Sequence, residues 1–237
     1  MGKIEFLKTM TNHWNKLAKY FRTSNASSAD NVEIVEPILI KEIQKIDNVK
    51  IIDYGCGSGN FCKRISSFVE SILGIDTSTE MIKIAKKYNN GKNIEYTNKF
   101  IYDFNIDNFN VLNAEFLFQF IPDKELDKFL KLVSKSNINT IMMVNDNVDF
   151  INKTIELKKD KFSIKEDRFF INLKDNQIKL YPRTTNLYTK LFKKINFEIK
   201  EIHELKFPKK FLEKFPEYKS YPTNISAYTV MIFKIRN

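Results

Sequence analysis

The sequence predicts an α/β protein built on a doubly wound, mostly parallel sheet, and two observations lead to this prediction. Short apolar segments alternate with amphipathic helical segments five times between residues 49 and 146, at the spacing of successive βαβ units. Two longer alternating segments, 197–207 and 227–235, follow with no complete helix between them. This pattern predicts an antiparallel ending to the sheet, which then has seven strands.

The region before the sheet is expected to be helical over its 47 residues. Trp14 and Phe21 share one apolar face at helical spacing, which predicts an amphipathic helix. After a polar break at 23–31, a second helix follows, with Pro37 at its start or at a kink.

The central region supplies the parallel strands. The five predicted strands are 49–53, 71–76, 93–100, 110–118 and 140–146. Thr77 and Glu80 have the spacing of a capping box for the helix after the second strand, and Asp123 is the predicted N-cap of the helix before the fifth.

Residues 147–182 interrupt this pattern, because they are polar and irregular, with only short strand-like pieces at 168–173 and 177–181. The segment is long for a connector, so we expect an inserted cap. A helix from Thr185 to Ile195 then returns the chain to the sheet. The predicted organisation is a single domain with a helical lid (1–47), a core (48–146), a cap insertion (147–182) and the remainder of the core (183–237).

The composition excludes several classes of protein. With 43% hydrophobic and 14% aromatic residues, the chain of 237 residues is able to bury a core, which excludes wholesale disorder. No stretch approaches the roughly 18 apolar residues of a membrane span, and the N-terminus has no apolar signal core. We therefore expect a cytoplasmic protein with no membrane partner, in which Cys56 and Cys62 are reduced thiols.

The net charge of +10 leaves two interpretations open. Only five of the basic residues are Arg, and the Lys are spread along the chain, which is typical of a solvated lysine-rich surface. Clustering on one face would instead indicate a nucleic-acid or anionic partner.

The sharpest feature is the loop Asp53-Tyr54-Gly55-Cys56-Gly57-Ser58-Gly59, which lies between a predicted strand and a helix. Glycines there allow positive φ angles and close approach of the backbone to a ligand. At the carboxyl end of the first strand, they line the crevice in which doubly wound sheets bind nucleotides. Asp76 ends the second strand, where an acid accepts hydrogen bonds from ribose hydroxyls.

The loop departs from two phosphate-binding patterns. Its third glycine, Gly59, falls one place early for a dinucleotide fingerprint, with Asn60 in the required position, and the G-K-[ST] of a P-loop is absent. Asp53, two residues before the first glycine, repels a pyrophosphate but is a good partner for a cationic amine. These departures argue against a dehydrogenase and indicate an amino-acid ligand at this end.

These motifs resemble those of the class I S-adenosylmethionine-dependent methyltransferases. IIDYGCGSGNF is similar to the first motif of the family, LGIDTSTEMIKIAKK to its second, and LFQFIPDKELDKFLKLV to the segment after its fourth strand. KKINFEI resembles the approach to the sixth strand, with Asn196 where the family usually has Gly. The resemblance covers 49–146 well and 184–235 in outline. It implies a Rossmann-like sheet, S-adenosylmethionine as cofactor and S-adenosylhomocysteine as product.

The resemblance also assigns the site residues. Asp53 and the glycine loop would hold the methionine part of the cofactor, Asp76 the ribose, and Met81 would lie near the adenine. The family's adenine-binding acid has no counterpart at the matching place, Phe100–Ile101. The predicted cofactor-binding residues are Tyr20, Asp53, Gly55, Cys56, Gly57, Gly59, Asp76, Thr77, Met81, Phe100, Ile101 and Glu115.

The acceptor side is less defined. Four residues are candidate bases, none of them decisive: His13, Glu115, Asp146 and His203. Tyr181 and Arg183 precede the late helix on the crevice side and are candidates to anchor an anionic or sugar-like acceptor, since Arg offers a forked donor. No metal site is predicted.

The predicted reaction is methyl transfer to an oxygen or nitrogen of a small molecule. An RNA or protein acceptor is the alternative that the charge suggests, although Asn113-Ala114-Glu115-Phe116 is not the N-P-P-Y type that clamps a flipped base. A non-catalytic nucleotide-binding protein on the same fold is a second alternative. The sequence does not indicate an oligomeric state.

Overall fold

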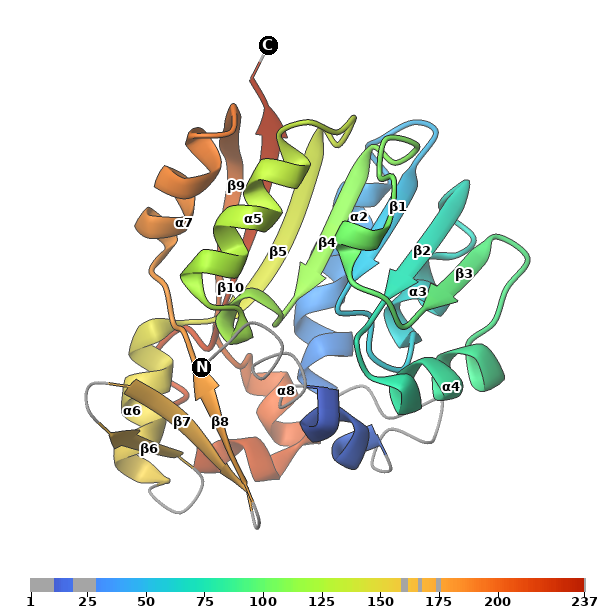
Figure 1. The fold of residues 1–237 in the computed structure, drawn as a ribbon. Coiled ribbons are helices and arrows are strands. Elements are labelled where there is room, and N and C mark those ends of the chain that lie inside the picture. The colour runs from blue at the N-terminus through green and yellow to red at the C-terminus, as the bar shows by residue number, and fades with distance from the viewer. Residues whose placement is uncertain (1–10, 19–28, 159–161, 166–167, 174–175, 237) are drawn as a thin grey trace.

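The computed structural model describes residues 11–18, 29–158, 162–165, 168–173 and 176–236. Its centre is a seven-stranded sheet of order β3-β2-β1-β4-β5-β10-β9 (Figure 1). The strands are β1 (Lys50–Tyr54), β2 (Ser71–Ile75), β3 (Ile94–Thr97), β4 (Val111–Glu115), β5 (Thr140–Asp146), β9 (Phe197–Leu205) and β10 (Tyr228–Ile235). The first five are parallel, and β10 runs antiparallel to both of its neighbours, β5 and β9. The predicted fold class is confirmed.

Helices cover both faces of this sheet. The helices α2 (Glu36–Ile43), α3 (Asn60–Ile65) and α4 (Thr79–Tyr88) contribute to one apolar core, and α5 (Asp123–Val133) and α7 (Thr185–Lys193) to the other. Because both faces are covered, β1, β4 and β5 are buried along nearly their whole length.

The helix starts agree with the predictions in part. Pro37 lies in the first turn of α2, directly after a π-helical turn (η2, Asn31–Val35), as predicted. The capping box predicted from Thr77 is wrong, because the N-cap of α4 is Ser78, whose hydroxyl accepts a hydrogen bond from the Met81 amide. The N-cap predicted at Asp123 is also wrong: Pro122 occupies that position, and Asp123 is the first helical residue.

Segment 147–182 is more regular than the sequence predicts. It begins with the helix α6 (Val148–Leu157), and a separate antiparallel sheet follows, made of β6 (Phe162–Lys165), β7 (Arg168–Leu173) and β8 (Asn176–Leu180). The helix buries Phe150, Ile151 and Ile155 at helical spacing, a pattern that the surrounding polar residues mask in the sequence. In Figure 1, α6 and this small sheet lie at the end of the molecule toward which the parallel strands point.

The link between β9 and β10 adds a helix, α8 (Lys209–Lys214), and a 3-10 turn, η5 (Pro216–Ser220). Before the sheet, residues 11–17 form the predicted N-terminal helix, while Tyr20 lies outside the described residues. In the part of the chain that the structure describes, no helix is long and apolar enough to cross a membrane.

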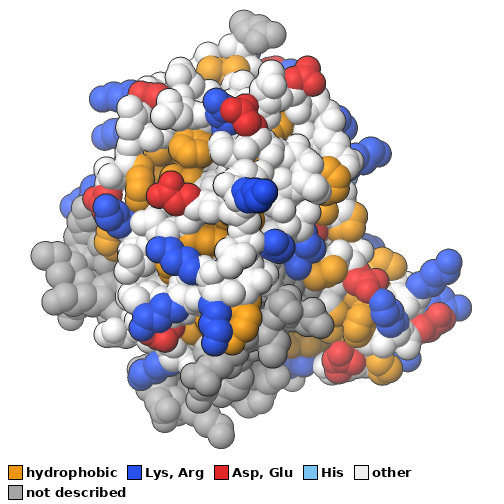
Figure 2. All heavy atoms as spheres, turned by 90° about the vertical axis from the view of Figure 1, so that its right-hand side faces the viewer, with side chains coloured by type: hydrophobic (Ala, Val, Ile, Leu, Met, Phe, Trp, Pro, Cys, Tyr) orange, Lys and Arg blue, Asp and Glu red, His pale blue; other side chains and the backbone are white. Residues whose placement is uncertain are grey.

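The positive charge is not gathered on the face in Figure 2. Lys and Arg side chains are spread over it and alternate with Asp, Glu and apolar side chains. On this face, the arrangement agrees with a solvated lysine-rich surface.

Candidate functional site

A cavity of about 750 Å³ opens at the carboxyl ends of the parallel strands. The glycine loop enters it after β1, Asp76 after β2, Glu115 at the end of β4 and Asp146 at the end of β5. Parallel strands end at one edge of the sheet, so residues far apart in the sequence meet there.

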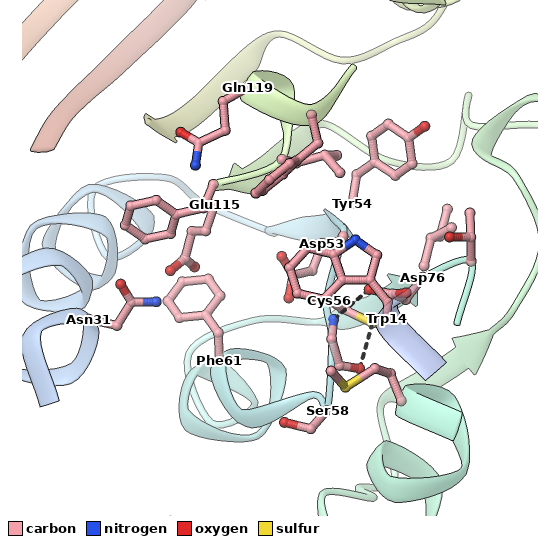
Figure 3. Close-up of a pocket in the computed structure, with 18 of the residues that line it drawn as sticks. Trp14, Asn31, Asp53, Tyr54, Cys56, Ser58, Phe61, Asp76, Glu115 and Gln119 are labelled. Carbon is pink, nitrogen blue, oxygen red and sulfur yellow. Dashed lines mark hydrogen bonds between the residues drawn. The ribbon is translucent and has the colours of Figure 1, made fainter. Parts of the chain in front are cut away.

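The Asp76 carboxylate organises the glycine loop (Figure 3). One oxygen accepts a hydrogen bond from the Gly57 amide at 3.0 Å, and the other accepts one from the Ser78 amide at 2.8 Å. The amides of Gly55 and Cys56 donate to the carbonyl of Ile75 at 2.7 and 3.0 Å. The loop is therefore fixed to the end of β2 and the start of α4 before any ligand arrives.

The Tyr96 side chain also contacts the glycine loop. Its hydroxyl lies 3.2 Å from the Gly59 carbonyl oxygen and 2.9 Å from that of Asn89. Gly59 has φ +78°, and a Cβ atom there would lie 2.5 Å from the tyrosine hydroxyl. Gly59 is thus required for its backbone conformation and for the space taken by Tyr96.

Two carboxylates, Asp53 and Glu115, share one amide donor beside the loop. The Asn113 side-chain nitrogen donates to Asp53 at 2.9 Å and to Glu115 at 3.0 Å, and the Cys62 thiol donates to Asp53 at 3.1 Å. Burial raises the pKa of Asp53 to about 6, although both hydrogen bonds oppose the shift. Burial, together with the charges of Asp53 and Glu36, raises the pKa of Glu115 well above its usual value.

One cation, Arg64, reaches this acidic group of residues. Arg64 binds Glu36 through both carboxylate oxygens. The hydrogen bonds that the described residues donate to Asp53 and Glu115 come from the neutral side chains of Asn113 and Cys62. A ligand with a positive charge fits this arrangement, because it would offset the cost of burying the two carboxylates.

The N-terminal helix crosses the cavity from α4 to the 3-10 turn η4 (Phe118–Phe120). On one side of the helix, Asn15 accepts hydrogen bonds from the Ser78 hydroxyl at 2.7 Å and the Glu80 amide at 3.2 Å. The neighbouring Trp14 ring packs edge-on against Phe120, with centroids 5.5 Å apart. Trp14 lines the cavity, so this helix occupies the position of a lid.

Comparison with known proteins gives the same picture. Residues 51–136 match the family model of a methyltransferase domain. The protein 235L of Invertebrate iridescent virus 6, named as a methyltransferase, is 29% identical over 189 residues, which are 73% of this chain and 68% of that protein. A solved structure titled as an S-adenosylmethionine-dependent methyltransferase from Listeria monocytogenes superposes with a TM-score of 0.66 at 19% identity, over 85% of this chain and 97% of the other.

Residues 51–136 thus match a methyltransferase domain, and the solved structures with the same fold include S-adenosylmethionine-dependent methyltransferases. The recognition made from the sequence motifs is confirmed, and S-adenosylmethionine is the cofactor of this family. A further relative is the ubiquinone biosynthesis O-methyltransferase of Actinobacillus pleuropneumoniae, 26% identical over 129 residues. That match spans 49% of this chain and about half (55%) of the relative's length.

Most of the predicted cofactor residues line the cavity of the methyltransferase. They are Asp53, Gly55, Cys56, Gly57, Asp76, Thr77, Met81, Phe100 and Glu115, and the candidate base Asp146 lines it as well. Gly59 and Ile101 are not among the lining residues: Gly59 lies over Tyr96, and Ile101 is fully buried. Cys56 and Cys62 are free thiols, as predicted, and burial raises the pKa of both.

Neither histidine is among the residues that line the cavity. His13 is buried against Trp14, with ring centroids 5.2 Å apart, and its Nε2 atom has no partner within the described part of the chain. His203 lies on the edge strand β9, where Nε2 is 2.9 Å from a Glu201 carboxylate oxygen. Neither position supports a role as catalytic base.

Several lining residues escaped the sequence analysis. Trp14 is indicated only by its helical spacing, Gln119 lies in the segment that resembles the family's after the fourth strand, and Asp30, Glu36 and Tyr228 carry no recognisable motif. Gln119 makes two hydrogen bonds with Asp146. Its side-chain nitrogen donates to the Asp146 carboxylate at 2.7 Å, and its side-chain oxygen accepts from the Asp146 backbone amide at 2.9 Å. The signal for Gln119 is the resemblance of the segment that follows β4.

The acceptor role predicted for Arg183 does not agree with its contacts. Its side chain is 3% exposed, and its guanidinium donates to Asp123 and to the carbonyls of Phe118 and Ile121 at 2.6–2.9 Å. Tyr181 is likewise absent from the cavity lining, and its amide donates to the Gln119 carbonyl. Arg183 therefore joins the end of β8 to the turn before α5.

Arg183→Lys is expected to lower the free energy of unfolding by about 2 kcal/mol, because Lys lacks the fork that reaches both carbonyls and the carboxylate. Urea unfolding checks this, with the exposed Arg236→Lys as the matched control. Binding of S-adenosylhomocysteine should not change. Wild-type stability of the Arg183 variant would show that the buried fork contributes nothing.

The raised carboxyl pKa values make stability depend on pH. A carboxyl group whose pKa is higher in the folded state contributes stability fully below its unfolded pKa, near 4, and loses it as the pH rises through the folded value. We expect Glu115→Gln to have no effect at pH 4 and to stabilise the free protein by about 1 kcal/mol at pH 8. Urea unfolding at both pH values tests this against the exposed Glu95→Gln. A stabilisation that is equal at both pH values would contradict it.

Proposed function

We propose that this methyltransferase transfers a methyl group from S-adenosylmethionine to an oxygen or nitrogen of a small acceptor. The observation that carries the proposal is the pair of buried carboxylates, Asp53 and Glu115, beside a glycine loop that Asp76 holds in place. The cofactor bears an amine and a sulfonium, and a site with excess buried negative charge suits both.

Different residues of the cavity would bind different parts of the cofactor. Asp53 and Glu115 would hold the amine of the methionine part, the Asp76 carboxylate the ribose hydroxyls, and Met81 and Phe100 would pack near the adenine. When bound, S-adenosylmethionine supplies a methyl group on a positively charged sulfur. The chain contributes alignment and the exclusion of water, for which the Trp14 helix lies across the cavity.

Four features support a small acceptor over RNA or protein. The N-terminal helix narrows access to the cavity, and the face in Figure 2 has no basic cluster. A second cavity adjoins the first, and α6 and β8 from segment 147–182 contribute to its wall. This supports the role of an acceptor cap for that segment. The likeness to an O-methyltransferase supports acceptors of this size.

Calorimetric titration of S-adenosylhomocysteine, with NAD as the control ligand, tests the cofactor half of the proposal. We expect micromolar binding of the thioether and none of NAD. If the folded protein binds no thioether, the proposed methyltransferase function is wrong. Binding of the thioether without turnover on any acceptor would favour a non-catalytic nucleotide-binding protein. Binding of RNA that weakens steeply with salt would instead favour the nucleic-acid alternative.

A further inference from the structure

The second cavity, of about 500 Å³, continues from the first. Asp30, Asp146 and Tyr228 line both cavities and form the junction between them. A molecule bound in the second cavity would thus present its reacting atom beside these three side chains. We take this junction as the place where acceptor and cofactor meet, which rests on the proposed function.

Aromatic rings form much of the wall of the second cavity. They belong to Phe150, Phe207, Tyr218, Tyr221 and Tyr228. Phe150 and Tyr221 stack, with ring centroids 6.2 Å apart and an interplanar angle of 20°, and the Lys158 ammonium lies 3.5 Å from the Tyr221 centroid. The rings of this wall therefore already accept a cation at one point.

Carboxylates occupy the junction. Asp30 is buried and accepts hydrogen bonds from the hydroxyls of Tyr218 and Tyr228, the first at 3.0 Å. Asp146 accepts from Gln119 and, because of burial, has a pKa raised to about 6. The described side chains that donate to these two carboxylates, Tyr218, Tyr228 and Gln119, are all neutral.

Acidic side chains outnumber basic ones in the lining of both cavities. Their described lining residues include eight carboxylates and two cations. Both cations are engaged: Arg64 with Glu36, and Lys158 with the Ser220 hydroxyl at 2.9 Å and the Tyr221 ring. The chain is strongly basic as a whole, yet the space in which an acceptor would react is acidic, which disfavours an anionic acceptor.

An unpartnered polar atom also points to a ligand. Thr154, on α6, is 2% exposed and lines the second cavity. Within the described part of the chain, its hydroxyl oxygen has no hydrogen-bond partner. A buried hydroxyl without a partner is costly, and a bound molecule would supply one.

We propose that the second cavity binds an amine acceptor, with an apolar ring-sized body between the aromatic residues and its nitrogen at Asp146. The amine arrives as an ammonium ion, and one proton passes from its nitrogen to the Asp146 carboxylate. The nitrogen lone pair then forms the new bond to the methyl carbon, while the electrons of the breaking C–S bond stay on sulfur and leave a neutral thioether. Asp146 later releases its proton to solvent.

The charges in the cavity favour nitrogen over oxygen in this step. Methyl transfer moves the positive charge from sulfur to nitrogen, where the Asp30 carboxylate and the ring of Tyr228 stabilise it while Asp146 holds the proton taken from the amine. An acceptor hydroxyl would have to develop negative charge next to the same two carboxylates. The arrangement therefore stabilises one outcome and opposes the other.

Three probes of similar shape test the proposal by binding alone: phenethylamine, 2-phenylethanol and phenylacetate. Each is titrated calorimetrically into the protein, with and without saturating S-adenosylhomocysteine. We expect phenethylamine to bind at least ten-fold more tightly than the alcohol, and phenylacetate to bind most weakly. Equal affinity of amine and alcohol, or tighter binding of phenylacetate, would overturn the amine proposal.

Asp146→Asn should weaken phenethylamine binding at least ten-fold and leave 2-phenylethanol unchanged, whereas the exposed Asp149→Asn should change neither. An amine affinity that does not respond to Asp146→Asn would also overturn the proposal. Failure of the proposed function is distinguishable, because it appears as absent S-adenosylhomocysteine binding in the wild-type protein. The three-probe comparison on wild type stands even if the variant does not fold.

Discussion

Replacing Asp76 by Asn is expected to weaken S-adenosylhomocysteine binding by about 100-fold or more, equivalent to roughly 2.7 kcal/mol. The carboxylate accepts from the Gly57 and Ser78 amides with its two oxygens. An amide side chain offers only one acceptor oxygen, so its nitrogen would face a backbone donor. The loop then loses one anchor, and the ribose hydroxyls lose part of a charged acceptor.

Calorimetry at pH 7.5 measures this effect, and Asp127→Asn on the exposed side of α5 is the matched control. Circular dichroism confirms that both variants are folded. Wild-type affinity of Asp76→Asn would contradict the assignment of the ribose to Asp76. Equal losses in both variants would mean that removal of negative charge anywhere on the protein produces the effect.

Two glycines only two positions apart are expected to respond to alanine in different ways. A Cβ atom at Gly59 would lie 2.5 Å from the Tyr96 hydroxyl and 2.7 Å from its ring carbon, at φ +78°. At Gly57, with φ +53°, a Cβ atom meets nothing within 4 Å. Gly59→Ala should therefore lower the free energy of unfolding by about 3 kcal/mol through left-handed strain and overpacking, and Gly57→Ala by about 1 kcal/mol through strain alone.

The binding effects should not follow the stability effects. Gly57 lines the cavity, so its added methyl group occupies space next to the ligand, and we expect at least a ten-fold loss of S-adenosylhomocysteine affinity in a folded protein. Urea unfolding and calorimetry on both variants separate the two effects. If the two substitutions destabilise the protein equally, the contact between Tyr96 and Gly59 has no energetic importance.

The cofactor side of the cavity was predictable because its signals are local. The glycine loop and Asp76 each follow a buried strand, and parallel strands with these ends leave little freedom in where the residues meet. Asp146 was found by the same reasoning, as the acid at the end of β5. Its detailed environment was not, because Gln119 lies on a separate turn.

The acceptor side was not predictable in this way. The second cavity combines residues from the N-cap of η2, from β5, from α6 and from the link after β9. These elements are distant in the sequence and share no motif. Arg183 shows the opposite error: an Arg before a helix on the correct side of the sheet suggested a ligand, but its donors are used by nearby carbonyls. The position of Arg183 in the sequence predicts which side of the sheet it lies on, but it does not predict which groups its guanidinium binds.

The position of β10 between β5 and β9 bears on how the protein folds during synthesis. β9 leaves the ribosome first, and residues 206–227 follow before its sheet partner, a delay of about 1–4 s at ordinary elongation rates. Until then β9 has no neighbour in the sheet, and its backbone donors and acceptors are open to other chains. β10 also brings Tyr228, which lines both cavities. The nascent chain therefore cannot be stabilised by ligands at that junction until β10 has emerged, and chaperone protection would matter most in this interval.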